Sequence, residues 1–460
     1  MPVSPARAAA FDILLRVVRE GSYASELLHS STYDHLSKSD HALATEMVMG
    51  VLRWRSRLDD EIATASSQPL SKLDIEILIA LRLALYQLQF LDRIPQHAAL
   101  HESVELVKRA RKRSAVPFVN AVLRKLSAAR KNNNLTVDGN SPENLAKVLA
   151  HPLWLVERWV KEYGFSTAHA ISEHNQSIPP TVIRLRTLDA EAELTQEGIV
   201  LSPGDLLSAA RRVMAGDVTK TQAFHHGQIA IQDEASQLVA ALVGPIASGR
   251  PSSDNRSRFA IRILDCCAAP GGKTLSIADR NPAASVTAVE LHPHRARLLR
   301  KLIASVPSSA QIQIIAADAR FLPTSSLFDR VLADVPCSGT GTLARNPEIK
   351  WRLVPNDLVD LRSRQIAILR SALNRVAPGG RLIYSTCSLE REENEGVIEE
   401  VLSDDSSFQL VNCLAELEQL KEAGELGWAN PVSLTRGPYL RTIPGIHPCD
   451  GFFAAILEKS

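Results

Sequence analysis

The stretch that decides the fold runs from Leu264 to Thr274 and reads LDCCAAPGGKT. An apolar run precedes it and a helical pattern follows it, so it is expected to be a loop between a strand and a helix. Pro270 stiffens the loop, and Gly271 and Gly272 let the backbone approach a ligand closely. Amides at the start of the next helix favour anionic groups such as carboxylate or phosphate. The spacing matches neither a Walker loop nor G-x-G-x-x-G.

Strands and helices alternate regularly from residue 259 to the end of the chain. The predicted strands are Phe259–Asp265, Ser285–Leu291, Gln311–Asp318, Asp329–Asp334, Arg381–Ser385 and Gly451–Leu457. A helix is predicted over Asp357–Val376. This alternation predicts a doubly wound, mostly parallel sheet, which binds ligands at the carboxyl ends of its strands.

Two cysteines follow the ends of two predicted strands. Cys337 lies in DVPCSGTG, residues 334–341, and Cys387 lies in YSTCS, residues 384–388. Because parallel strands end at one edge, both thiols and the glycine loop are expected to face a single crevice. This combination indicates a cofactor-dependent enzyme with a covalent cysteine mechanism.

Acidic residues also mark three successive strand ends. Glu290 stands where an acid accepts ribose hydroxyls of a bound nucleoside, and Asp318 where it can reach an adenine edge. Asp334 ends the next strand. A single acid at such a position is often only a helix cap, but three together favour a binding site.

The composition limits the class of protein. The chain has 460 residues, of which 45% are apolar and 22% charged, and its net charge is +1. This length predicts about three domains, and a nucleic-acid footprint must be local. The six cysteines show no zinc-binding spacing, so no metal site is expected and the thiols are typical of a reduced, cytoplasmic protein. Charges interrupt the most apolar stretch, Leu73–Phe90, so no membrane span is expected.

Residues 1–135 are predicted to form a helical domain. Ser4 is expected to cap the first helix, with Pro5 in its first turn and Gly21 just past its end. A small α/β domain is expected over residues 146–245, and residues 246–258 form a Ser-, Pro- and Arg-rich linker before the domain 259–460. The small domain is predicted to contain the strands Thr181–Leu185 and Gln228–Gln232 and a helix over Leu206–Met214.

A basic run lies near the end of the helical domain. It consists of Lys108, Arg109, Arg111, Lys112, Arg113, Arg124 and Lys125. It is either a solvated helix face or a phosphate-contacting stripe, and the second is favoured because few acidic residues lie nearby in sequence.

Residues 259–457 resemble the AdoMet-dependent RNA cytosine-5 methyltransferases of the Sun (Fmu) family. DVPCSGTG with TCS carries the resemblance, together with RNPEIKW at 345–351 and DGFF at 450–453. The N-terminal domain, with FVNAVLRK at 118–125, resembles the NusB-like RNA-binding domain. The resemblance implies an all-α bundle, a small α/β domain of RNA-binding type, and a class I (Rossmann-like) methyltransferase domain.

The resemblance also implies roles for the site residues. Cys387 would be the nucleophile that adds to cytosine C6, and Cys337 would assist proton removal and product release. Asp334 would contact the cytosine edge, and Lys273 would orient the base and activate Cys387. The implied S-adenosyl-L-methionine (AdoMet) site consists of Cys267, Ala268, Ala269, Pro270, Gly271, Gly272, Lys273, Glu290, Asp318 and Asp334. DNA cytosine-5 enzymes use the Pro-Cys thiol as nucleophile, so the reverse assignment stays open.

The domain fusion implies that the partner is 16S rRNA, either unassembled or in an early small subunit. The family suggests a monomer without an obligate protein partner. A transfer RNA or another ribosomal cytosine stays open as the substrate. A non-enzymatic alternative is a NusB-like RNA-binding or antitermination factor.

Overall fold

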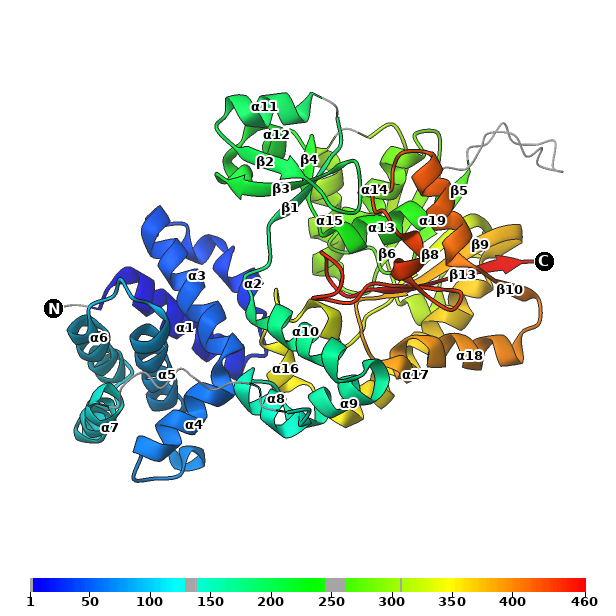
Figure 1. Cartoon of the computed structure of the whole chain (residues 1–460). Helices are drawn as coiled ribbons and strands as arrows, with labels where there is room; N and C mark the ends of the chain where they lie inside the picture. Colours follow the sequence, from blue (N-terminus) through cyan, green and yellow to red (C-terminus); the bar gives the residue numbers. More distant parts are fainter. Residues whose placement is uncertain (1–2, 129–136, 138, 188, 245–260, 307) are drawn as a thin grey trace. The chain divides into compact units, whose positions relative to one another are not determined.

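The computed structural model describes residues 3–128, 137, 139–187, 189–244, 261–306 and 308–460 (Figure 1). These residues form two compact units. Unit 1 contains residues 1–178 and 343–352, and unit 2 contains residues 179–342 and 353–460. The predicted linker 246–258 lies outside the described residues.

The regular structure described for unit 1 is helical, and it extends beyond residues 1–135, for which helices were predicted. Its α-helices are α1 Pro5–Arg19, α2 Ala24–Leu28, α3 Lys38–Arg53, α4 Arg55–Ala65, α5 Ile75–Phe90, α6 Gln96–Arg109, α7 Val116–Ala128, α8 Pro142–Val148, α9 Leu153–Tyr163, α10 Phe165–Gln176 and α16 Ile349–Arg352. Every residue of α5 from Ile77 to Gln87 is buried, so this helix is the centre of the bundle. The charge that interrupts it, Arg82, is paired with Asp59 at 2.6 Å.

The first helix begins and ends where the sequence predicts. Ser4 occupies the N-cap position, Pro5 lies in the first turn, and Gly21 has a φ of +67° just past the end. The expected capping bond is absent, however. The Ser4 hydroxyl instead accepts a hydrogen bond from the Arg7 guanidinium at 3.0 Å, because Arg7 lies in the same first turn and is itself buried.

Unit 2 contains a small antiparallel sheet with the order β2-β3-β1-β4. Its strands are β1 Val182–Leu185, β2 Val200–Pro203, β3 Ala210–Ala215 and β4 Ile229–Ile231, and its helices are α11 Ala190–Gln196, α12 Gln222–His225 and α13 Glu234–Leu242. Arg184 and Arg186 pair with Asp279, which lies on α14 (Gly272–Arg280). These pairs join the small sheet to the helix that follows the glycine loop.

The predicted helix over Leu206–Met214 is wrong, because residues 210–215 form strand β3. Its apolar spacing is compatible with a helix, but β1 and β2 supply sheet partners on both sides of β3. The preceding turn is held by the buried Glu234, whose carboxylate accepts backbone N–H bonds from Leu206 at 2.7 Å and Leu207 at 2.8 Å. Tertiary pairing therefore overrides the local pattern.

The larger sheet of unit 2 has the order β11-β12-β13-β9-β8-β5-β6-β7, with β10 pairing β13. Its strands are β5 Arg262–Asp265, β6 Ser285–Glu290, β7 Gln311–Ala316, β8 Phe328–Asp334, β9 Val376–Thr386, β10 Phe408–Val411, β11 Thr435–Arg436, β12 Tyr439–Arg441 and β13 Phe453–Lys459. The remaining helices are α15 Pro293–Ser305, α17 Pro355–Leu373, α18 Glu395–Asp404 and α19 Cys413–Glu422.

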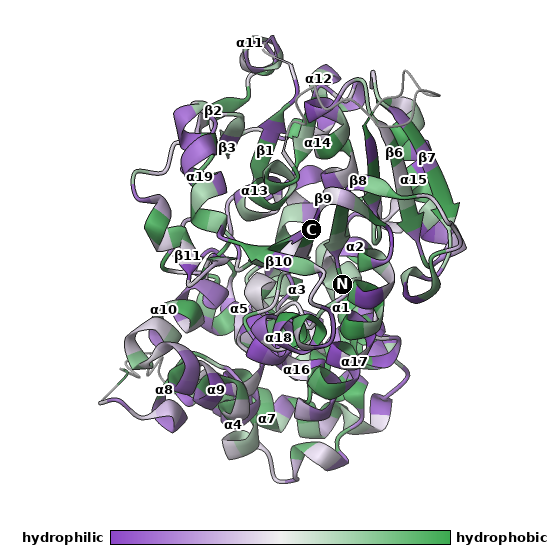
Figure 2. Ribbon diagram, turned by 90° about the vertical axis from the view of Figure 1, so that its right-hand side faces the viewer, coloured by the Kyte–Doolittle hydropathy of each residue, from purple (hydrophilic) through white to green (hydrophobic). Residues whose placement is uncertain are grey.

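Strands β5 to β9 pair in parallel, whereas β13 pairs antiparallel with β9. The strand order reverses at β5, because β6 and β8 lie on opposite sides of it. This is the topological switch point at which doubly wound sheets form a ligand crevice. Figure 2 shows hydrophobic colouring along β6 and β7 and mixed colouring along the amphipathic α9. The predicted fold class is confirmed.

Residues 343–352 lie within the methyltransferase-like stretch of the sequence, but in the structure they pack within unit 1. The Trp351 indole donates to the Leu52 carbonyl at 2.6 Å, and Arg352 donates to the Gly21 carbonyl at 2.7 Å. Lys350 is 1% exposed, and its ammonium nitrogen donates to the Arg53 carbonyl at 2.9 Å. Burial, reinforced by the charge of Arg53, holds the pKa of Lys350 well below its ordinary value.

This lowered pKa predicts a pH-dependent stability. At pH values between this lowered pKa and the ordinary value of 10.5, Lys350 carries a proton in the unfolded chain but not in the native protein. The free energy of unfolding should therefore rise with pH, by up to about 1.4 kcal/mol per pH unit. Lys350→Met should lose this contribution, so its stability curve should be flatter from neutral to alkaline pH.

The slope of the free energy of unfolding against pH is measured by urea denaturation at several pH values, with tryptophan fluorescence as the signal. Lys147→Met replaces an exposed lysine of the same unit and should keep the wild-type slope. Equal slopes for wild type and Lys350→Met would show that the buried amine stays protonated in the native protein.

Candidate active site

Two neighbouring parallel strands, β8 and β9, bring Cys337 and Cys387 together in unit 2. Strand β8 ends at Asp334, which lies opposite Ser385 of β9. The chain leaves both strands at the same edge of the sheet, a short distance before each cysteine. The two Sγ atoms lie 3.3 Å apart. The hydrogen bond with Cys387, together with burial, raises the pKa of the Cys337 thiol well above its ordinary value.

An ion pair lies at the same strand ends. The Lys273 ammonium nitrogen is 2.8 Å from Asp334 Oδ2, and the Ser385 hydroxyl donates to Asp334 Oδ1 at 2.7 Å. Lys273 also lies 4.9 Å from the centre of the Phe452 ring. Burial favours the neutral amine, but the charge and hydrogen bond of Asp334 outweigh it and raise the pKa of Lys273. Lys273 therefore presents a fixed positive charge beside the thiols.

The predicted glycine loop connects β5 to α14. Gly271 has a φ of +115°, and a Cβ there would lie 2.6 Å from Leu299 Cδ1, so the position requires glycine. Thr274 at the start of α14 donates to Asp265 Oδ2 at 2.7 Å. Burial raises the pKa of Asp265 to about 6. The loop is thus tied to the end of β5, and the first amides of α14 lie at the carboxyl edge of the sheet.

The other two strand-end acids differ in their surroundings. Glu290 is buried at the end of β6 and accepts the His292 backbone N–H at 2.9 Å. Asp318 follows β7 and caps a short helical turn, where the Arg320 guanidinium lowers its pKa through a hydrogen bond at 2.6 Å. The Asp318 carboxylate is therefore already bonded to Arg320. Asp318 also has the helix-capping role that a single acid at a strand end often has.

Comparison with known proteins shows what this arrangement resembles. Family models match three parts of the chain: the NusB family at residues 4–128, the RsmF/B-like ferredoxin-like domain at 151–213, and 16S rRNA methyltransferase RsmB/F at 255–458. The probable ribosomal RNA small subunit methyltransferase B of Bacillus subtilis (strain 168) is 32% identical, and 100% of each chain is covered. The chain belongs to the RsmB/F family.

Another relative and a solved structure agree with this. The ribosomal RNA small subunit methyltransferase B of Vibrio cholerae serotype O1 is 31% identical, with 98% of this chain and 97% of the relative covered. The crystal structure of PH0851 shares the fold, with a TM-score of 0.79 at 23% identity and 100% of each chain covered. Membership of the RsmB/F family makes the chain an RNA methyltransferase, so the alternative of a purely RNA-binding factor is wrong.

The basic run lies in unit 1 of this RsmB/F chain, and part of it is neutralised. Lys108 pairs with Glu105 at 2.7 Å. Arg109 pairs with Asp12 at 2.7 Å, and Lys112 pairs with Asp74 at 2.8 Å. Asp12 and Asp74 come from distant helices or their ends, so the small number of acidic residues nearby in sequence does not leave Arg109 and Lys112 without acidic partners.

The other basic side chains have different surroundings. Lys125 donates to the Ala65 carbonyl at 3.0 Å. Arg111, Arg113 and Arg124 are exposed, and no acidic partner for them is found within the residues that the structure describes.

Sequence reasoning missed three side chains near the strand ends and the cysteine loops. Phe452 lies in the quoted DGFF but gave no sign of a contact with Lys273. Gln232 lies 3.6 Å from a Cβ placed on Gly272, and its buried Oε1 has no hydrogen-bond partner in the described part of the chain. Glu393 is completely buried between the two cysteine loops. Acidity and proximity to Cys387 were the only sequence signals for Glu393.

Two kinds of feature are absent from the residues that the structure describes. No helix there is long and apolar enough to cross a bilayer. No group of three or more His, Cys, Asp and Glu side chains there is arranged to hold a metal ion.

The raised pKa of Cys337 gives a direct test of the thiol geometry. Removing the hydrogen-bonding partner in Cys387→Ala should lower the pKa of Cys337, because that bond is the largest cause of the upward shift. The rate of Cys337 alkylation by iodoacetamide, measured by peptide mass spectrometry against pH, should then rise at lower pH than in the wild type. Cys413→Ala, at a buried thiol near the Ala454 carbonyl, is the matched control. If the pH at which Cys337 alkylation reaches half of its maximal rate were unchanged in Cys387→Ala, that result would contradict the close approach of the two thiols.

Proposed function

We propose that this RsmB/F enzyme transfers a methyl group from AdoMet to C5 of a cytosine in 16S rRNA. The observation that carries the proposal is the 3.3 Å approach of the Cys337 and Cys387 sulfurs beside the glycine loop. The relatives from Bacillus subtilis and Vibrio cholerae are named small subunit rRNA methyltransferases, which supports this class of substrate.

The chemistry of cytosine explains the need for two thiols. C5 is a poor nucleophile until a thiolate adds to C6, after which the electron pair of the C5–C6 double bond makes C5 enamine-like. Once C5 carries the methyl group, its proton must leave on a base. The resulting electron pair restores the double bond and expels the sulfur. One sulfur therefore bonds to C6, and a second group assists proton removal and release.

We assign Cys387 as the nucleophile and Cys337 as the group that assists removal of the C5 proton and release of the product. The division follows the resemblance of residues 386–388, TCS, to the Sun (Fmu) family, in which this cysteine is the nucleophile and the Pro-Cys cysteine assists release. Cys387 interacts electrostatically with the Lys273 ammonium, which offsets negative charge at a reacting sulfur. Asp334 holds Lys273 in place and is assigned to the cytosine ring edge.

The residues at the strand ends fit AdoMet. The first amides of α14 suit its carboxylate, and the unpartnered Oε1 of Gln232 beside Gly272 suits its ammonium group. Glu290 at the end of β6 suits the ribose hydroxyls. Asp318 would have to share its carboxylate with Arg320 to reach the adenine. When bound, AdoMet supplies a methyl group on an electrophilic sulfonium centre.

The RNA must present an unstacked cytosine, because the thiols cannot reach C6 of a base within a helix. A single-stranded loop is the easiest substrate of this kind. Unit 1 matches the NusB family, and its exposed Arg111, Arg113 and Arg124 are proposed to contact RNA phosphates. We propose that the enzyme acts as a monomer on free or early small-subunit rRNA.

Variants of the two cysteines test the mechanism. Cys387→Ala should bind RNA but transfer no methyl group, since no sulfur can add to C6. Cys337→Ala should accumulate a covalent protein–RNA adduct that survives denaturing gels, because release is impaired. The measurements are methyl transfer from labelled AdoMet and gel analysis of RNA adducts, with Cys413→Ala as an active control.

The reverse assignment predicts the opposite pattern, in which the adduct requires Cys337 and does not need Cys387. Bisulfite sequencing of rRNA from a deletion strain should show one 16S cytosine that has lost its protection. A complete 16S pattern with a loss in transfer RNA or 23S rRNA would reject the proposed substrate.

Two triple variants of the basic run test the RNA surface. Arg111→Ala/Arg113→Ala/Arg124→Ala should weaken RNA binding and reduce the slope of log K against log salt by up to about 2, since three phosphate contacts are lost. The control, Lys108→Ala/Arg109→Ala/Lys112→Ala, removes the same charge from residues that have acidic partners. It should change the slope less. Equal effects in a salt-dependent filter-binding assay would show that only overall charge matters.

A further inference from the structure

A single buried carboxylate joins the two cysteine loops. Glu393 is 0% exposed and lies in the turn that precedes α18. Its Oε2 accepts hydrogen bonds from the hydroxyls of Ser338 and Ser388. Ser338 directly follows Cys337, and Ser388 directly follows Cys387. One oxygen atom thus connects the two Cys-Ser pairs.

The other carboxylate oxygen holds one of the same loops. Glu393 Oε1 accepts the Ser338 backbone N–H at 2.8 Å and the Gln365 side-chain N–H at 2.9 Å. The Gln365 amide also donates to the Pro336 carbonyl at 2.9 Å. The carboxylate therefore has four donors, and three of them belong to the residues next to the two cysteines.

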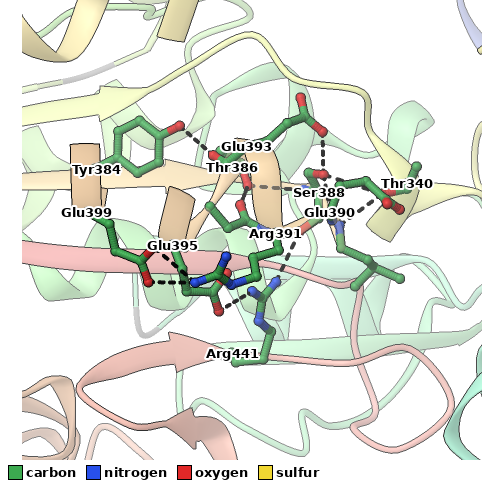
Figure 3. Close-up of polar contacts among 12 residues, drawn as sticks. Thr340, Tyr384, Thr386, Ser388, Glu390, Arg391, Glu393, Glu395, Glu399 and Arg441 are labelled. Carbon is green, nitrogen blue, oxygen red and sulfur yellow. Dashed lines mark hydrogen bonds and ion pairs between the residues drawn. The ribbon is translucent and has the colours of Figure 1, made fainter. Parts of the chain in front are cut away.

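The position of Glu393 is itself fixed by neighbouring contacts (Figure 3). The Tyr384 hydroxyl donates to the Glu393 carbonyl at 2.6 Å. Asn394 donates to the Ser388 carbonyl at 2.9 Å, and Arg441 donates to the same carbonyl at 3.3 Å while pairing with Glu395. These contacts tie the turn to β9 and to the Cys387 loop, so the Glu393 carboxylate cannot follow the Cys337 loop if that loop moves.

The hydrogen bonds of the Glu393 carboxylate depend on the spacing of the two cysteine loops. In the described part of the chain it has no cationic partner, so its buried charge is compensated only by hydrogen bonds. Loss of any donor leaves part of a buried charge unsatisfied. Moving either loop away from the other breaks at least one bond, so the carboxylate opposes changes in the sulfur–sulfur distance.

We propose that Glu393 is a positioning residue that sets the spacing of Cys337 and Cys387 for methyl transfer. Its relevance to catalysis rests on the two-cysteine function proposed above, but its first test needs neither RNA nor activity. Glu393 acts through the loops and is not assigned a contact with the reacting base.

The spacing is measured as the tendency of the two thiols to form a disulfide. In a glutathione redox buffer, the two thiols lose two electrons and two protons, and one glutathione disulfide becomes two glutathione molecules. Peptide mass spectrometry then gives the equilibrium fraction of the Cys337–Cys387 disulfide, and hence the effective concentration of one thiol at the other. Glu393→Ala should lower this concentration at least about tenfold, which corresponds to about 1.4 kcal/mol.

Glu393→Gln is the conservative variant. Its oxygen can accept the two N–H donors, and its amide can donate to the two serine hydroxyls after they rotate. It should stay within about threefold of the wild type, which is less than the loss of one buried hydrogen bond. The matched control is Glu234→Ala, at another fully buried carboxylate, which binds the backbone of Asp205, Leu206 and Leu207 and not the cysteine loops. It should lower the melting temperature without changing the disulfide equilibrium.

A wild-type disulfide equilibrium in Glu393→Ala would overturn the proposal, as would an equal decrease in Glu234→Ala. If Glu393→Ala does not fold, Ser338→Ala removes only one donor, and an unchanged equilibrium there would also overturn it. If Glu393→Ala fails this disulfide test while wild type methylates RNA, the positioning role is wrong and the proposed function stands. If wild type methylates no RNA but the disulfide depends on Glu393, the proposed function is wrong and the positioning role stands.

Discussion

The candidate site depends on the parallel pairing of β8 with β9. This pairing places Asp334 opposite Ser385, and each strand then leads directly into a cysteine loop. A slip of one residue would turn the strand-end side chains to the opposite face of the sheet and separate the thiols. Both strands are internal, with β5 beside β8 and β13 beside β9, so partners on both sides hold the register.

The strand ends and the cysteine loops contain charged side chains that are compensated in two different ways. Lys273 and Asp334 form an ion pair at 2.8 Å, whereas Glu393 has hydrogen bonds and no cationic partner among the described residues. Both arrangements are stable only when every partner is in place. The same requirement that satisfies the charges therefore holds the two cysteine loops in place, as the proposed reaction between the sulfur atoms and a cytosine would require.

The path of the chain links the Cys337 loop to unit 1. After Thr342 the chain leaves unit 2, contributes residues 343–352 to the packing of unit 1, and returns at Leu353. Within unit 1 these residues bind backbone carbonyls through Lys350 and Trp351. The segment that resembles part of a methyltransferase motif thus serves in the core of the helical unit, and the family model at residues 255–458 spans it.

The sequence alone determined strands β5 to β9 and β13 of the larger sheet and the neighbouring positions of Cys337 and Cys387, because apolar runs of strand length and glycine-loop chemistry are local signals. It did not reveal the short strands β10, β11 and β12. Only the tertiary structure decided that part of Leu206–Met214 forms a strand, since its sheet partners lie elsewhere in the chain. The same holds for the pairing of Arg109 with Asp12, and for the burial of Glu393 among donors from three segments. A contact between distant residues depends on how the chain folds back on itself, and local pattern carries no information about that.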